Sequence, residues 1–318
     1  MNDKQLIVVA LGGNAISRPD EEGNVAQQFA HSRETASALA DLIQQGHHLV
    51  ITHGNGPQIG NFLLRNRAAA DKIYPLPMEV AVAHVQGGMG FMIAATLTNE
   101  LIARSHERPV TAIVTMVLVD RDDPSFANPT KPIGRQVSKE EARKYTADAG
   151  WTFQEVAPGQ YRRLIASPLP RRILEIDIIR RAVHAGDLLV VCGGGGIPVV
   201  REPNTGLRGV RAVIDKDMTS SMLARELDVD TMMILTNVDR VSLNYGQANE
   251  EPIETMTLEQ AQNWADEGQF PSGSMGPKIQ CGIDFLRATH KPHARVIIGP
   301  LDKAADAVAG RVGTQITK

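Results

Sequence analysis

Cysteine is nearly absent from this chain, which has only Cys192 and Cys281 in 318 residues. The two lie far apart without Cys-x-x-Cys spacing, which argues against a disulfide framework and a structural zinc site. Aromatic residues make up only 4%, and neither sign of charge dominates, because 33 basic residues oppose 36 acidic ones. A net charge of -3 gives no general attraction to nucleic acid or anionic lipid. We expect a cytoplasmic protein without a nucleic-acid or membrane partner.

Long hydrophobic runs are also missing. The apolar residues after Lys4 stop at Gly12, too early for the hydrophobic region of a secretion signal. The longest other apolar stretch, residues 78–97, is interrupted by Glu79, by other polar side chains and by three glycines, so we do not expect it to span a bilayer. With 42% hydrophobic and 22% charged residues, the composition is that of an ordinary globular protein.

Short β-branched runs alternate along the chain with segments of helical period. The predicted strands are 6–11, 48–52, 111–119, 188–192, 231–236 and 295–298. The predicted helices are 27–45, 57–70, 78–104, 171–185, 216–227, 257–267 and 275–289. Because the strands are almost continuously apolar, this order predicts an α/β fold with an open, mostly parallel sheet and helices on both faces. Ligands then bind in the loops beyond the carboxyl ends of the strands.

Residues 120–170 break this alternation, because they are rich in proline and charge. They include Arg121-Asp122-Asp123 next to Pro124, and a second proline-rich string at 128–132. We interpret them as a protruding lid inserted within a single domain of residues 1–318. Composition alone equally allows a floppy surface insertion.

Four glycine-rich segments follow predicted strands or open helices, and each lets backbone N–H groups approach an anion closely. They are residues 11–14, 53–57, 193–198 and 273–278. Pro57 and Pro277 suit first helical positions, where a missing N–H is no loss. Lys278 is not followed by Ser or Thr, and the loop at Gly54 lacks the third glycine of a dinucleotide fingerprint. A P-loop enzyme and a nicotinamide-dependent dehydrogenase are therefore disfavoured.

Two lysines stand where helices are expected to begin. Lys216 and Lys278 oppose the helix dipole there, at a cost of about 0.3–1 kcal/mol each unless an anion is bound. We interpret them as ligands of one polyanion, against the alternative of two solvated surface lysines. Phosphoryl transfer needs such charges, backbone donors and Mg²⁺, and the sequence lacks the motifs of protein kinases, serine hydrolases and metalloproteases. His53 receives no role, because a lone histidine at a strand end more often makes ordinary hydrogen bonds.

Six strings of this sequence closely resemble the carbamate kinases of the amino acid kinase superfamily, and the similarity runs from end to end. They are residues 10–15, 52–58, 128–134, 193–199, 213–217 and 273–278. More distant relatives share the glycine loops but not the proline-rich string that contains Lys131. The resemblance implies a three-layer αβα sandwich with a protruding lid, assembled as a homodimer. It also implies the reaction ATP + carbamate ⇌ ADP + carbamoyl phosphate.

The same resemblance implies the site residues. Lys131, Lys216 and Lys278 would bind the transferring phosphoryl group, with Lys131 carried by the lid, and Asp217 would orient the lysine pair or contact the nucleotide. The residues expected around carbamate and the phosphoryl oxygens are Gly12, Gly13, Asn14, Gly54, Asn55, Gly56, Gly193 and Gly194. The residues expected to line the nucleotide pocket are Asn237, Tyr245, Met275 and Pro277. The N-terminal part would face carbamate or carbamoyl phosphate, and the C-terminal part the nucleotide.

Mg²⁺ would be held mainly by the phosphates of ATP or ADP, without a metal ligand in the protein. The family suggests nitrogen or arginine metabolism, with the reaction run towards ATP synthesis in catabolism. Two alternatives stay open, namely a phosphotransferase with another small acidic acceptor and a nucleotide-binding sensor without activity. Residues 78–88 differ in detail from the family pattern, and we read His84 and Gln86 there as the polar edge of a core helix.

Overall fold

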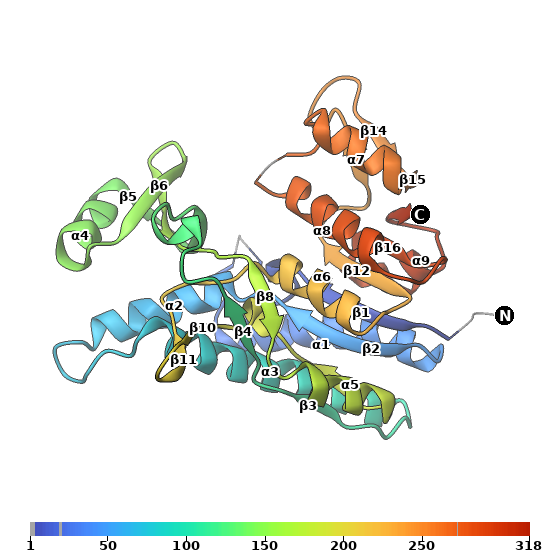
Figure 1. Ribbon diagram of the computed structural model, residues 1–318, viewed down its shortest axis with the longest axis horizontal. Coiled ribbons are helices and arrows are strands. Elements are labelled where there is room, and N and C mark those ends of the chain that lie inside the picture. The colour runs from blue at the N-terminus through green and yellow to red at the C-terminus, as the bar shows by residue number, and fades with distance from the viewer. Residues whose placement is uncertain (1–3, 19–20, 272) are drawn as a thin grey trace.

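The computed structural model describes residues 4–18, 21–271 and 273–318, without the side chain of Asn14 (Figure 1). Its central sheet has eight strands in the order β15-β17-β16-β12-β1-β2-β9-β3. Among the described strands of this sheet, every pairing is parallel except that of β16 with β17. The strands are β1 (Leu6–Leu11), β2 (His48–His53), β3 (Val110–Ala112), β9 (Leu188–Val190), β12 (Thr231–Thr236), β15 (Thr255–Thr257), β16 (Arg295–Pro300) and β17 (Thr314–Thr317).

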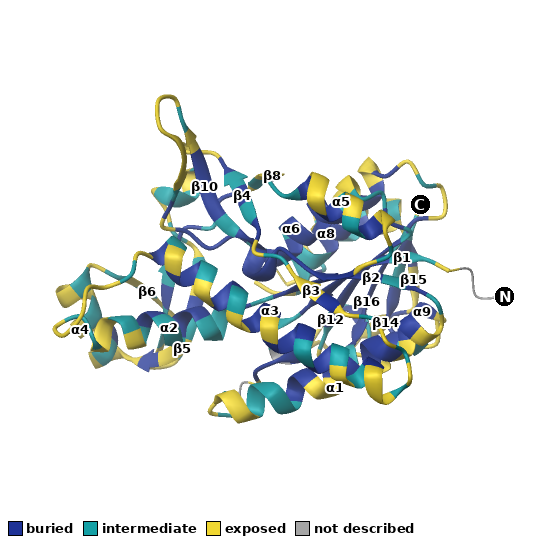
Figure 2. Ribbon diagram, turned by 90° about the horizontal axis from the view of Figure 1, so that it is seen from below, coloured by how far each residue is buried: buried dark blue, intermediate teal, exposed yellow. Residues whose placement is uncertain are grey.

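Two hydrophobic cores lie on the two faces of the sheet, as alternate residues of β1 show. Ile7, Val9 and Leu11 pack into the core shared with α1 (Val25–Gln44), α2 (Gly56–Ala68), α3 (Met78–Ala103) and α9 (Ala304–Val308). Val8 and Ala10 pack into the core shared with α5 (Ile176–His184), α6 (Lys216–Glu226), α7 (Leu258–Asp266) and α8 (Met275–Ala288). Figure 2 shows the strands buried between the helices. The predicted α/β sandwich is confirmed, because strands covered on both faces must be apolar throughout.

Two predicted elements are wrong. Residues 111–119 form β3 and then β4 (Met116–Val119), which joins a second sheet in the order β11-β10-β4-β8. The predicted helix 171–185 begins only at Ile176, because residues of β8 (Pro170–Ile173) pair with β4 instead. The other strands of this sheet are β10 (Ile197–Glu202) and β11 (Gly206–Gly209), and β13 (Val241–Leu243) pairs with β14 (Glu251–Ile253) separately.

Helix α3 has the length and composition of a membrane span, contrary to the expectation from its polar interruptions. Its most apolar window has a mean hydropathy of 1.5, but 61% of that window is buried within the protein. The helix packs against α1 and β3. Packing in the core therefore accounts for its apolar composition.

Residues 131–165, called the inserted unit below, form a three-stranded sheet in the order β5-β7-β6 with one helix. Its elements are β5 (Lys131–Ser138), α4 (Lys139–Ala149), β6 (Thr152–Ala157) and β7 (Gln160–Ile165). Ser138 and Glu141 form a capping box at the start of α4, and Gly150 ends that helix with a left-handed φ of 63°. Figure 1 shows the unit standing out from the central sheet, and β5 packs on α2.

A substitution of Phe285 tests the packing of the hydrophobic core beneath α8, because the Phe285 side chain on that helix is fully buried. We expect Phe285→Ala to lower the free energy of unfolding by about 3–5 kcal/mol, through lost apolar burial and a residual cavity. Urea unfolding followed by circular dichroism measures this. Tyr74→Ala is the control, because Tyr74 is 76% exposed, and equal losses in the two variants would contradict the packing described.

Candidate functional site

Three glycine loops meet at one edge of the central sheet. Strands β1, β2 and β9 are parallel neighbours, so their carboxyl ends lie side by side. A 3₁₀ turn at Gly13–Ala15 follows β1, α2 begins at Gly56 after β2, and a 3₁₀ turn at Gly193–Gly195 follows β9. The predicted placement of glycine loops beyond the strands is confirmed for these three.

The loops after β2 and β9 touch so closely that glycine is required. A Cβ on Gly193 would lie 2.3 Å from His53 Nε2, and a Cβ on Gly194 would lie 2.0 Å from Asn55 Nδ2. Gly194 also has a left-handed φ of 64°. The side chains of His53 and Asn55 therefore rest directly on the backbone of the loop after β9.

Asn55 has an unused donor at this point. It is the N-cap residue of α2, yet its side chain makes no capping hydrogen bond, although capping is the ordinary role of Asn there. The residue is 2% exposed, and its Nδ2 has no hydrogen-bond partner among the residues that the structure describes. A buried amide donor without a partner is costly, so this atom is well placed to bind an anionic oxygen.

Gln86 on α3 holds the loop after β9 in place. Its Nε2 donates to the Gly193 carbonyl oxygen at 2.9 Å, and its Oε1 accepts from the Thr115 N–H at 2.7 Å. Within the loop, the Gly195 and Gly196 N–H groups donate to Cys192 and Gly193. The expectation of a polar helix edge is wrong for Gln86, which is 3% exposed, whereas His84 is exposed.

Three lysines from three elements gather on two carboxylates. Lys131, at the start of β5, donates from Nζ to Asp215 Oδ2 at 2.9 Å and to the Ile214 carbonyl oxygen at 3.2 Å. Lys278, on α8, donates to Asp217 Oδ2 at 2.6 Å, and Lys216, the first residue of α6, pairs with the other oxygen of Asp217. The structure thus brings together all four predicted catalytic residues.

Asp215 was missed from the sequence, although its position carries a signal. As the N-cap residue of α6 it accepts from the Asp217 N–H at 2.8 Å through Oδ1, while its other oxygen accepts from Lys131. An Asp directly before a predicted helix is a typical N-cap. The cap fixes the Asp215 carboxylate, which then orients Lys131 beside Lys216.

Burial and charge set the protonation of this cluster. Burial lowers the pKa of Lys216, and the Asp217 carboxylate opposes that shift. Burial would raise the pKa of Asp217, but Lys216 and Lys278 outweigh it and hold that pKa below its ordinary value. Burial opposes the charge on Lys278 as well, yet Asp217 raises the pKa of Lys278 overall. Three ammonium groups thus face two carboxylates, an arrangement that favours an added anion.

The lysine cluster adjoins the glycine loops. A Cβ on Gly54 would lie 3.6 Å from Lys216 Cε and 3.4 Å from the Gly13 nitrogen. A Cβ on Gly12 would lie 3.0 Å from the Leu235 carbonyl oxygen of β12. Backbone amides of two loops and the Lys216 side chain therefore occupy one small region.

His53 is a neutral imidazole in this setting, because burial lowers its pKa to about 4. Its Nδ1 lies 3.1 Å from the Gly54 carbonyl oxygen, an ordinary hydrogen bond of the kind expected. The ring also borders a cavity of about 250 Å³ together with Gln86 and Gly193. We therefore assign His53 to the shape of the loop rather than to proton transfer.

The predicted nucleotide residues all come from the part of the chain that follows β12. Met275 and Pro277 belong to the first turn of α8, next to Lys278. Pro277 is the third residue of that helix and Pro57 the second of α2, so neither is at the first position predicted. Asn237 follows β12 and Tyr245 follows β13, and both side chains are exposed. The Asn14 side chain lies outside the described residues.

Within the described residues, no group of three or more His, Cys, Asp or Glu side chains is arranged to hold a metal ion. Asp215 and Asp217 are already engaged by lysines. A divalent cation at this site would therefore take its ligands mainly from a bound polyanion.

Comparison with known proteins gives consistent results. A model described as the amino acid kinase family matches residues 5–298. The carbamate kinase of Pyrococcus horikoshii is 41% identical over 313 residues, 98% of each chain. That of Clostridium perfringens is 43% identical over 315 residues, 98% of this chain and 99% of the relative. The structure of Giardia lamblia carbamate kinase bound to AMP-PNP has a TM-score of 0.90 and 37% identity, covering 100% of both chains.

Asp217→Asn tests the charge cluster. The substitution leaves Lys216 and Lys278 buried without their shared carboxylate, so we expect a loss of about 3–5 kcal/mol in unfolding free energy at neutral pH. Because the pKa of folded Asp217 lies below its ordinary value, this stabilisation is present above about pH 4 and is lost as the pH falls towards the lowered value.

Urea titrations of the unchanged protein and of the Asp217→Asn variant between pH 8 and about pH 3 measure the difference in their unfolding free energies. The control is Asp177→Asn, because Asp177 pairs with Arg180 at the surface and its side chain is 67% exposed. This substitution should lower the free energy of unfolding by less than about 1 kcal/mol. A difference that grows on acidification would be inconsistent with a lowered pKa for Asp217.

Proposed function

Because the chain belongs to the carbamate kinases of the amino acid kinase family, we propose that its lysine cluster is the centre of phosphoryl transfer between carbamoyl phosphate and a nucleotide. The protein is a phosphotransferase with the reaction ATP + carbamate ⇌ ADP + carbamoyl phosphate. The observation that carries the proposal is the convergence of Lys131, Lys216 and Lys278 on Asp215 and Asp217, beside the glycine loops.

The three ammonium groups stabilise the charge on the migrating phosphoryl group. Phosphoryl transfer needs little covalent chemistry from a protein, and electrostatic stabilisation with positioning supplies most of the rate. Asp217 orients Lys216 and Lys278, and Asp215 orients Lys131. When the phosphoryl group is bound, its oxygens take the place of part of this carboxylate contact.

The glycine loops and Asn55 hold the acceptor side. Backbone N–H groups of Gly13, Gly56, Gly193 and Gly194 approach the carbamate and phosphoryl oxygens, and Asn14 completes this side. Gly12 and Gly54 line the same side, but their N–H groups donate to the Leu235 and Leu11 carbonyl oxygens, so they contribute close backbone approach rather than donors. The unpartnered Nδ2 of Asn55 donates to one of these oxygens. A site made of backbone donors and one amide suits a small, planar anion.

No general base is required. In the direction of ATP synthesis, a terminal phosphate oxygen of ADP attacks the phosphorus of carbamoyl phosphate, the new P–O bond forms, and the P–O bond to carbamate breaks. Both the attacking oxygen and the leaving carbamate are anionic, so no proton moves. This agrees with a neutral His53 and with carboxylates that are occupied by lysines.

The nucleotide lies on the C-terminal side, with Asn237, Tyr245, Met275 and Pro277 around its base and ribose. Mg²⁺ would be held mainly by the nucleotide phosphates and water, as its preference for phosphate oxygens suggests. When bound there it would supply charge neutralisation. The inserted unit acts as a lid that carries Lys131 and excludes water from the phosphoryl group.

A homodimer is supported by an exposed apolar stripe on α3. Val80, Phe91 and Ile102 recur every 11 residues and therefore lie on one side of this helix, with exposures of 36%, 64% and 54%. A second copy of the chain would cover them in an isologous interface. Two free, buried cysteines support a cytoplasmic enzyme, and we assign it to catabolic ATP synthesis in nitrogen or arginine metabolism.

Two alternative functions can be distinguished from this one by experiment. A phosphotransferase for a different small acid would form no ATP from carbamoyl phosphate and MgADP but would use that other acceptor. A nucleotide-binding sensor would bind ATP in calorimetry and turn over no acceptor. The convergence of three lysines argues against the sensor, because binding alone does not require all three at one point.

We expect Lys131→Ala, Lys216→Ala and Lys278→Ala each to lower kcat for ATP formation by about 100- to 1000-fold, because each removes a charge from the transferring group. A coupled assay of ATP from carbamoyl phosphate and MgADP measures this. Lys72→Ala is the matched control, since Lys72 is exposed and remote in sequence from the site. Full rates in all three site variants would refute the assignment.

A further inference from the structure

The inserted unit and α2 meet backbone to backbone at one point. A Cβ on Gly60 of α2 would lie 2.0 Å from Gly134 Cα and 2.7 Å from its nitrogen, and a Cβ on Gly134 would lie 3.2 Å from Gly60 Cα. Gly134 also has a left-handed φ of 72°. Because the obstructing atoms are backbone, no rotamer change can make room for a side chain at Gly60.

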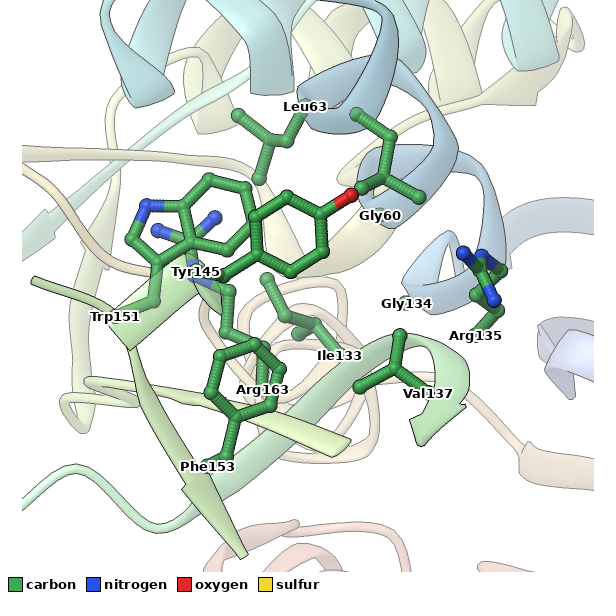
Figure 3. A pocket seen from close by; sticks show the side chains of 11 residues that line it. Gly60, Leu63, Ile133, Gly134, Arg135, Val137, Tyr145, Trp151, Phe153 and Arg163 are labelled. Atoms are coloured by element: carbon green, nitrogen blue, oxygen red, sulfur yellow. The ribbon is translucent and has the colours of Figure 1, made fainter. Parts of the chain in front are cut away.

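Apolar side chains close around this contact (Figure 3). A cavity of only about 30 Å³ is lined by Leu63 of α2, by Ile133 and Val137 of β5, and by Tyr145 and Trp151. The Arg163 guanidinium lies 3.7 Å from the centre of the Trp151 ring. Such a well-filled interface has little room to slide, so the glycine contact sets how closely the unit approaches α2.

Each of the two glycines in this contact lies close in sequence to a residue of the proposed site. Gly134 lies three residues after Lys131 on β5, and β5 is paired with β7 from Lys131 opposite Ile165 onward. Gly60 lies one turn into α2, whose N-cap is Asn55. A shift between the two backbones therefore moves Lys131 relative to the acceptor loop.

We propose that Gly60 and Gly134 are positioning residues for phosphoryl transfer, whose contact sets the depth at which the inserted unit docks and so holds Lys131 Nζ at 2.9 Å from Asp215. This inference rests on the proposed role of Lys131. Neither glycine is among the residues proposed to bind the substrates, so the pair acts through the lysine. Lys216, Asp217 and Lys278 lie on α6 and α8, which are not part of the contact.

Gly60→Ala tests the proposal, because the added methyl group forces β5 away from α2. A displacement of about 1 Å in a catalytic group can cost about 100-fold in rate. We expect kcat for ATP formation to fall by about that factor, while KM for MgADP stays within about threefold, because the proposed nucleotide residues lie on other elements. Gly88→Ala is the matched control, since Gly88 is an exposed helical glycine whose added Cβ meets nothing within 4 Å.

A double variant separates positioning from a general loss of structure. In a Lys131→Ala background, Gly60→Ala should change kcat by less than about threefold, because the residue through which it acts is already gone. Hydrogen exchange of residues 131–165 and of the central sheet reports the fold, and we expect faster exchange only in the former. A general loss of stability in the variant would instead speed exchange in the core strands as well, so the two effects are measured separately.

Two results would overturn the inference. One is a Gly60→Ala enzyme with kcat within twofold of the unchanged protein, and the other is a loss in the Lys131→Ala background as large as in the native background. If Lys131→Ala alone keeps its full rate, the proposed function of that lysine fails instead, and the glycine pair is then refuted as its positioning device.

Discussion

The structure depends on holding three ammonium groups within reach of one another. Like charges repel strongly in a partly buried site, so their gathering requires carboxylates placed between them. Asp217 accepts from both Lys216 and Lys278, and Asp215 accepts from Lys131. The start of α6 supplies both acids and one lysine within three consecutive residues, so one helix N-terminus organises the whole cluster.

Sheet order then decides which backbone amides face this cluster. Strand β1 lies between β2 and β12, and β2 lies next to β9, so three loops from distant parts of the sequence end together. Their contact distances leave no space for side chains at Gly193 and Gly194. Gln86 reaches from α3 to the Gly193 carbonyl oxygen and keeps this loop from relaxing. Glycine provides the close approach, and a buried amide provides the rigidity.

Local signals predicted much of this molecule. The strands at 6–11 and 231–236 match β1 and β12 residue for residue, because continuous apolar runs specify central parallel strands. Lys216 and Lys278 were identifiable because a cation in a first helical turn conflicts with the dipole. Local signals could not predict which residues contact each other across long distances in the sequence. The division of 111–119, the hydrogen bonds of Gln86 and the contact of Gly60 with Gly134 all depend on residues far away in sequence.

Lys131 is the one member of the lysine cluster that comes from outside the central sheet and its helices. Its ion pair with Asp215 is more exposed to solvent than the ion pairs of Asp217. The side chains of Lys131 and Asp215 are 22% and 32% exposed, whereas that of Asp217 is 8% exposed. Partly solvated ion pairs contribute little to stability, so this pair cannot by itself hold the inserted unit against the body. Apolar packing on Leu63 and the close backbone contact must do so. The chain therefore separates two tasks: packing on α2 places the unit, and the charge at its edge acts on the phosphoryl group once it is there.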